Sequence, residues 1–143
     1  MAFNRSKQVS RFNRPGSRNQ ALECIPVKNP RVAEEESGNG EVRLAYQVQV
    51  KPWFQGIYKR FSSRRNTVID RKLQLDVMGT AVWRMIDGQR TVREIIDAFQ
   101  AAHQANRREA EISVTTFFRE LGKRGLLAMR EGKINRSFPP DGA

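Results

Sequence analysis

Residues of the types that perform catalysis or bind metals are few in this chain and lie far apart. Cys24 is the only cysteine and His103 the only histidine, and neither has a partner at the spacing of a metal site or of a nucleophile and its base. We expect a plain thiol at Cys24 and a solvent-facing helix residue at His103. The acidic run at 34–36 has no neighbouring histidine or aspartate, so a solvated surface is expected there. The sequence therefore predicts a protein that is not an enzyme, without catalytic residue, metal site or cofactor.

The positive charge of the chain is unevenly distributed. The net charge is +11, yet residues 73–131 contribute only +1, whereas residues 1–22 carry +5 and residues 51–72 carry +6. Basic segments of this kind can contact phosphate groups or anionic lipid, although a short basic tail is commonly just solvated. The nearly neutral central part argues against nucleic acid as its partner.

The segment at 51–66 is basic and aromatic, which makes it the most unusual stretch of the chain. On a helical wheel its five large apolar side chains share one arc. Such a segment can lie in a membrane interface, dock into the groove of a partner protein or fold back over its own core. The residues that would contact a partner or a membrane are Trp53, Phe54, Ile57, Tyr58 and Phe61.

The elements that must position these residues centre on Lys72 to Phe99. Alternating leucines predict a strand that ends at Asp76, whose carboxylate can cap the helix that follows. That helix is expected to stop at Asp87-Gly88. The four residues from Thr91 to Glu94 then predict a capping box at the start of a second helix.

Weaker patterns surround this centre. Two strands joined by a glycine turn are expected between Ile25 and Val50, and a further strand is expected at 67–75. A third helix is predicted to begin near Ile112, with Ser113 as its cap, and to end at Gly125. The residues that follow predict a final strand, or a hairpin with its tip at 131–132.

These elements predict an α+β fold of the winged helix-turn-helix type, with an N-terminal three-stranded antiparallel sheet, three helices and a C-terminal strand or hairpin. We divide the chain into a flexible basic arm at 1–22, a winged-helix domain at 23–136 that contains the 51–66 segment, and a frayed tail at 137–143. The sequence shows neither a run of apolar residues that could span a membrane nor a secretory signal, so a cytoplasmic location is expected.

Two runs resemble the PqqD family, the peptide chaperone of pyrroloquinoline quinone biosynthesis and its relatives. They are LDVMGTAVWRMIDGQRTVREIIDAF from Leu75 to Phe99 and VTTFFRELGKRGLL from Val114 to Leu127. The shared pattern includes Trp83, the Asp-Gly turn, the capping-box residues and a later Gly-Leu-Leu, and the resemblance covers about residues 25–130. Family members known as recognition elements bind the leader of a ribosomally made peptide and present it to a modifying enzyme.

The resemblance implies a non-catalytic peptide-binding protein or a related scaffold. Its implied partners are a precursor or leader peptide and a modifying enzyme, often a radical S-adenosylmethionine protein. In the family, the leader adds as a strand to a sheet edge beside the third helix. Carried onto this chain, the edge is at 68–75, where basic residues favour an acidic leader. The implied peptide contacts are Val68, Ile69, Asp70, Arg71, Lys72, Leu73, Phe118, Arg119 and Gly122. The family joins its second and third strands by a short connection, so the 51–66 segment departs from its pattern.

Two alternatives belong to other classes of function. A winged-helix protein can bind DNA, here through Arg119, Lys123 and Arg124 of the third helix with the basic arms on phosphate groups. The 51–66 segment could instead make the chain a membrane-surface adaptor.

Overall fold

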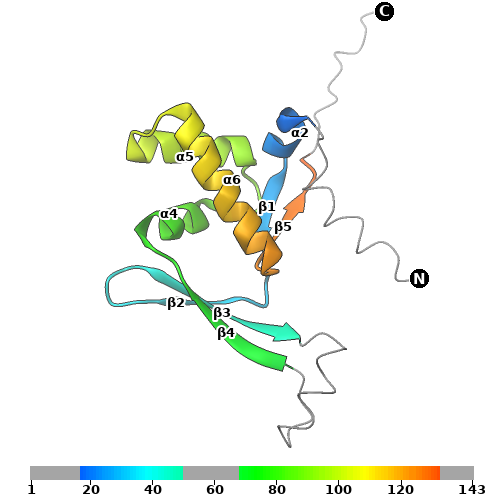
Figure 1. Cartoon of the computed structure of the whole chain (residues 1–143), viewed down its shortest axis with the longest axis vertical. Coiled ribbons are helices and arrows are strands. Elements are labelled where there is room, and N and C mark those ends of the chain that lie inside the picture. The colour runs from blue at the N-terminus through cyan, green and yellow to red at the C-terminus, as the bar shows by residue number, and fades with distance from the viewer. Residues whose placement is uncertain (1–16, 50–67, 133–143) are drawn as a thin grey trace, which may run out of the picture. The chain divides into compact units, whose positions relative to one another are not determined.

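Three antiparallel strands form one sheet of the computed structural model, which describes residues 17–49 and 68–132 (Figure 1). These are β2 (Ala33–Glu36), β3 (Val42–Gln49) and β4 (Val68–Gln74), and β3 lies between the other two. Leu44 of β3 lies opposite Leu73 of β4, and Val48 lies opposite Ile69. This register places the apolar residues of both strands on one face, as alternation at a period of two requires. The predicted three-stranded sheet is confirmed.

A tight turn joins β2 to β3 at the predicted glycines. The N–H of Ser37 donates to the carbonyl of Glu41 at 2.8 Å, and the side-chain oxygen of Asn39 accepts from the N–H of Glu41 at 3.2 Å. Gly40 has a φ of 82°, a left-handed conformation that glycine adopts without steric cost.

Helix α4 (Val77–Met85) begins directly after β4 and is held there by two hydrogen bonds. The carboxylate of Asp76 accepts from the N–H of Gly79 at 2.7 Å, which confirms the predicted cap. The hydroxyl of Thr80 accepts from the N–H of Val42 at 3.0 Å, and Thr80 is buried. The start of α4 is therefore tied to the start of β3.

The loop after α4 is organised by the carboxylate of Asp87. This carboxylate accepts from the backbone N–H of Arg90 at 2.8 Å and of Gln89 at 2.9 Å. Those two hydrogen bonds, chiefly the one from Arg90, lower the pKa of Asp87. Gly88 has a φ of 76°, in agreement with the predicted glycine turn.

Helix α5 (Val92–His103) begins with the predicted capping box. The hydroxyl of Thr91 accepts from the N–H of Glu94 at 3.2 Å, and the carboxylate of Glu94 accepts from the N–H of Thr91 at 3.4 Å. The buried side of this helix packs on α6 and comprises Val92, Ile95, Ile96 and Phe99.

Helix α6 (Arg107–Lys123) begins earlier than the sequence pattern suggested, and the prediction of Ser113 as its cap is wrong. Asn106 is the cap, and its side chain accepts from the N–H of Glu109 at 2.9 Å. The first buried residue of the helix is Ala110, a small side chain that gives a weak apolar signal. At the other end Gly125 has a φ of 74°, in agreement with the predicted stop.

A second, two-stranded sheet joins the two ends of the described chain. Strand β1 (Ile25–Lys28) pairs with the C-terminal strand β5 (Leu127–Arg130) in antiparallel orientation. Helix α2 (Arg18–Leu22) precedes β1, in a part of the chain for which we predicted a flexible arm. The guanidinium of Arg18 lies 2.5 Å from the carboxylate of Glu111 in α6. This ion pair links α2 to α6 and lowers the pKa of the Glu111 carboxyl. The final strand is confirmed, whereas the second arm of a hairpin would lie outside the described residues.

The chain divides into two compact units. One is Asn29–Trp83, which holds the three-stranded sheet. The other consists of the described parts of Met1–Lys28 and Arg84–Ala143, which hold α5, α6 and the β1–β5 pair. The largest fully buried side chains include Trp83 and Leu44 in the first unit, and Phe118 in the second. None of the described helices is both long and apolar enough to cross a membrane.

Candidate functional site

The outer edge of β4 is the candidate site, because β4 is the last strand of its sheet. The N–H of Leu75 donates to the carbonyl of Val42 at 2.9 Å, which fixes which residues of β4 bond to β3. In an antiparallel pair both backbone groups of alternate residues point toward the partner strand, and those of the residues between them point away. The residues whose N–H and carbonyl point away from β3 are Val68, Asp70, Lys72 and Gln74. No strand of the described chain pairs with this edge.

The same alternation on β3 supports this assignment independently. The N–H of Ser37 bonds to Glu41, in continuation of the β2–β3 register, so β3 directs the backbone groups of Arg43 and Ala45 toward β2. The residues between them, including Leu44, then face β4, as the bond from Leu75 requires.

The two faces of β4 differ in chemistry. Ile69 and Leu73 are half-buried and lie on the face that carries the buried residues of β3, and Arg71 lies between them, opposite Tyr46. The other face carries Val68, Asp70, Lys72 and Gln74, all of them exposed.

Side chains on the polar face already have partners within the sheet. The carboxylate of Asp70 accepts from the side-chain amide of Gln47 at 3.0 Å, and the ammonium of Lys72 lies 3.4 Å from the carboxylate of Glu35. Arg71, by contrast, is exposed and has neither an ion pair nor a side-chain hydrogen bond with any residue that the structure describes. Among the described residues, the cation of β4 without an ionic partner is therefore Arg71, on the apolar face.

Gln74 belongs to the outer edge but was absent from the predicted contacts. Its side-chain amide donates to the carbonyl of Leu75 at 3.1 Å, and this hydrogen bond helps to fix the end of the strand. A period of two counted from Val68 would have included Gln74, so the signal was present in the sequence.

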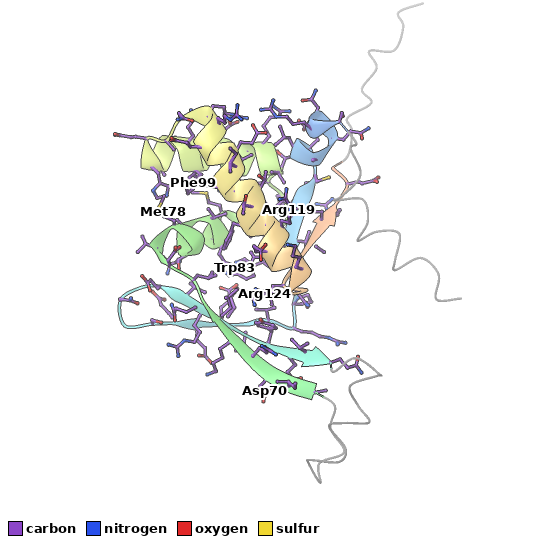
Figure 2. The ribbon with its side chains drawn as sticks, in the orientation of Figure 1. Asp70, Met78, Trp83, Phe99, Arg119 and Arg124 are labelled. Carbon is purple, nitrogen blue, oxygen red and sulfur yellow. The ribbon has the colours of Figure 1, made fainter. Side chains whose placement is uncertain are left out.

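The predicted residues of α6 differ in their exposure. Phe118 is only 1% exposed and belongs to the core, so in this structure its side chain presents almost no surface to a ligand. Arg119 and Gly122 are exposed on α6, and Figure 2 shows Arg119 on that helix. A Cβ added to Gly122 would lie 3.9 Å from the carbonyl of Leu127, an ordinary contact, so packing does not demand glycine there.

The β4 residues and the α6 residues lie in different compact units. A peptide contact for either set stays a prediction. The same holds for Trp53, Phe54, Ile57, Tyr58 and Phe61, which lie outside the described residues.

Groups that could perform chemistry are sparse in the described parts of the chain. Residues 17–49 and 68–132 contain no cluster of three or more histidine, cysteine, aspartate or glutamate side chains that could hold a metal ion.

Burial, with the nearby Glu131 and Glu23 carboxylates, raises the pKa of the Cys24 thiol, so it is protonated at neutral pH. His103 is not the solvent-facing residue that we predicted, because its ring lies 4.5 Å from that of Phe99 and its Nε2 is buried without a hydrogen-bond partner in the described structure.

Part of this chain is similar to known proteins. The sequence model described as Coenzyme PQQ synthesis protein D (PqqD) matches residues 67–127, from the start of β4 to the start of β5. The structure is similar to that of TbiB1 in complex with the TbiA(beta) leader peptide, with a TM-score of 0.50 and 21% sequence identity over 70% of this chain and 92% of that one. This likeness confirms the α+β fold. No curated protein sequence matches the chain.

Proposed function

We propose that this chain is a non-catalytic protein that binds the leader of a ribosomally made precursor peptide and presents it to a modifying enzyme, because the PqqD model matches residues 67–127. The observation that carries the proposal is the open outer edge of β4, at the beginning of that domain. An extended peptide can add to such an edge as a further strand, and main-chain hydrogen bonds then supply much of the affinity. TbiB1, a protein of similar fold, has been solved with a leader peptide, which supports the proposal.

We assign two kinds of contact to the edge. The backbone groups of Val68, Asp70, Lys72 and Gln74 would bond to the leader, since they point away from β3. The side chains of Ile69, Arg71 and Leu73 would lie beside leader side chains on the apolar face. The exposed α6 residues Arg119 and Gly122 are assigned to the leader by family resemblance alone, and Phe118 would support them from the core.

The chemistry is assigned to the partner enzyme. A protonated thiol at Cys24 is a poor nucleophile, and the ring of the half-buried His103 lies against that of Phe99 and has no hydrogen-bond partner at Nε2 in the described structure. A protein that contributes strand pairing and side-chain complementarity needs no cofactor of its own. The class of the enzyme, a radical S-adenosylmethionine protein or another, rests on the resemblance.

The test uses the full-length chain and a display library of random 20-residue peptides. Peptides enriched on the protein are titrated into isotope-labelled protein, and backbone amide shifts are recorded. We expect the largest shifts at Val68, Asp70, Lys72 and Gln74, whose N–H groups would gain acceptors, followed by exposed residues of α6. A library that yields no binder, or shifts confined to other elements, would reject the proposal.

Duplex DNA of random sequence serves as the competitor in the same titration. The described domain residues 73–131 carry only +1 of the net charge, so we expect DNA at physiological salt not to displace the peptide. Displacement that weakens steeply with salt, together with preference for one DNA sequence, would instead favour the winged-helix DNA-binding function.

A further inference from the structure

We propose that β4 selects a leader strand in which one acidic residue lies between two apolar residues, each two positions away from it, and that Arg71 recognises the acid. This inference rests on the proposed leader-binding function and adds the chemical pattern of the ligand. Three residues of β4 carry it, namely Ile69, Arg71 and Leu73, which share one face of the strand.

The backbone geometry places these three side chains closest to an added strand. The hydrogen-bonded positions of the outer edge are Val68, Asp70, Lys72 and Gln74. In an antiparallel addition the residues between them would therefore lie opposite the leader in non-hydrogen-bonded pairs, where side chains of the two strands approach most closely.

The chemistry of the same face gives the pattern. Ile69 and Leu73 are apolar and only half-buried, so each has apolar surface left for a neighbouring strand to cover. Arg71 between them is exposed and, among the described residues, has no carboxylate partner. An acidic leader residue opposite Arg71, with apolar residues opposite Ile69 and Leu73, would satisfy all three. Because the pattern is symmetric about the acid, it reads the same for either direction of the leader strand.

The polar face of β4 does not offer an equivalent signal. Asp70 already accepts from Gln47, and Lys72 is already paired with Glu35. A leader charge on this face would have to compete with a neighbour within the sheet. We therefore expect weaker selection at leader positions that alternate with the acidic one.

The charges of β4 also limit the registers in which it could pair with a second copy of the chain. Antiparallel pairing of two β4 edges must match outward-pointing residues with each other. In the three registers of greatest overlap, the central pair is Asp70 with Asp70, Arg71 with Arg71, or Lys72 with Lys72. The registers centred on Asp70 and on Lys72 place like charges directly opposite, which destabilises them, whereas the register centred on Arg71 also pairs Asp70 with Lys72 on either side of the two arginines. A leader with an acid at the centre meets Arg71 without that repulsion.

The test selects the random peptide library on three full-length proteins: wild type, Arg71→Glu and Arg108→Glu. Arg108 is an exposed residue in the first turn of α6, which belongs to the other compact unit, and its replacement changes the net charge by the same amount. We expect wild type and Arg108→Glu to enrich peptides in which an acidic residue has one apolar residue two positions before it and another two positions after it. Arg71→Glu should enrich Lys or Arg at the central position while it keeps the two apolar positions.

Each outcome separates the inference from the function on which it rests. If no protein enriches peptides, the proposed leader-binding function fails. The enriched peptides could shift the β4 amides and yet lack a central acid, or Arg71→Glu could still enrich peptides with that acid. In either case the leader-binding function stands, and recognition of the acid by Arg71 is overturned. If Arg108→Glu loses the acid as well, the preference reflects overall charge, which likewise overturns the inference.

Synthetic peptides then measure the size of the effect. An enriched peptide is compared with versions that carry Gln or Lys in place of the central acid, by calorimetric titration. Opposite charges paired across strands correspond to about a fivefold change in affinity, so we expect at least that loss for Lys on the wild-type protein. The Lys version should regain affinity on Arg71→Glu. Equal affinities of all three versions for the wild type would contradict the proposal.

Discussion

Strand β4 and helix α6 differ in how much of their backbone is hydrogen-bonded and in how many of their side chains are buried. Helix α6 has a side-chain cap at its start, a glycine stop at its end and four buried residues, among them Val114 and Phe118. Strand β4 has no fully buried side chain, and alternate backbone groups along its outer edge are unpaired within the described structure. The difference indicates that α6 contributes chiefly to stability, whereas β4 keeps part of its bonding capacity for a ligand.

The strongest way to test this division is to remove a core side chain of α6. Phe118→Ala should lower the free energy of unfolding by about 3–5 kcal/mol, because it leaves a cavity in place of a fully buried ring. Chemical denaturation measures the change, and Phe118→Leu, which retains much of the apolar volume, should lose less. If Phe118→Ala left stability unchanged while abolishing peptide binding, Phe118 would be a contact residue as first predicted, and the comparison would fail.

The hydrogen bond between the start of β3 and helix α4 is expected to contribute less to stability than Phe118. Thr80→Val keeps the size of the side chain but removes the hydroxyl that accepts from the N–H of Val42. An unpaired buried N–H costs about 1–3 kcal/mol, so the free energy of unfolding should fall by that amount. Thr80→Ser, which retains the hydroxyl, is the control. Hydrogen exchange at Val42 should accelerate only in Thr80→Val, and equal exchange in both variants would contradict the role of this bond.

Local chemistry made much of the fold predictable. The cap at Asp76, the capping box at Thr91 and the glycine stops at Gly88 and Gly125 depend on residues close to each other in sequence, and each appears where the pattern placed it. The start of α6 was missed because Asn106 and Ala110 carry little apolar signal, although they cap and bury the first turns. The tilted contact between the rings of His103 and Phe99 was also missed, although the two residues lie four apart on α5 and therefore share one face of that helix.

The candidate site was predictable in position but not in detail. Alternation in sequence identified β4 and its apolar face. It could not tell which backbone groups point outward, because that depends on the register with β3, which pairs residues such as Leu44 and Leu73 from distant parts of the chain. The engagement of Asp70 and Lys72 by neighbouring side chains, and hence the distinct position of Arg71, follows from the same register.

The third prediction sharpens the distinction between the two sides of β4 itself. Lys72→Pro removes an N–H that points away from β3, so peptide affinity should fall by about fivefold or more while stability changes little. Arg71→Pro removes an N–H that points toward β3, and it should lower the free energy of unfolding instead. Lys72→Ala is the matched control, because it loses the ion pair with Glu35 but retains the N–H. Similar stability losses in the two proline variants would show that the outward assignment is wrong.

The smallest expected effect lies in the loop between α4 and α5, where backbone groups are satisfied by a side chain. Hydrogen bonds from the N–H groups of Arg90 and Gln89 lower the pKa of Asp87. A carboxyl whose pKa is lower in the folded state stabilises that state at pH values above its unfolded pKa, and this contribution is lost as the pH falls through the folded pKa. The amide shifts of Gln89 and Arg90 should therefore titrate together at a pH below the usual range of an aspartate, and Asp87→Asn should abolish this titration. A midpoint at or above the usual aspartate value would contradict the two hydrogen bonds to the Asp87 carboxylate. The predicted midpoint would show that these N–H groups have an acceptor within the protein. The outward N–H groups of β4 have no such acceptor in the described chain.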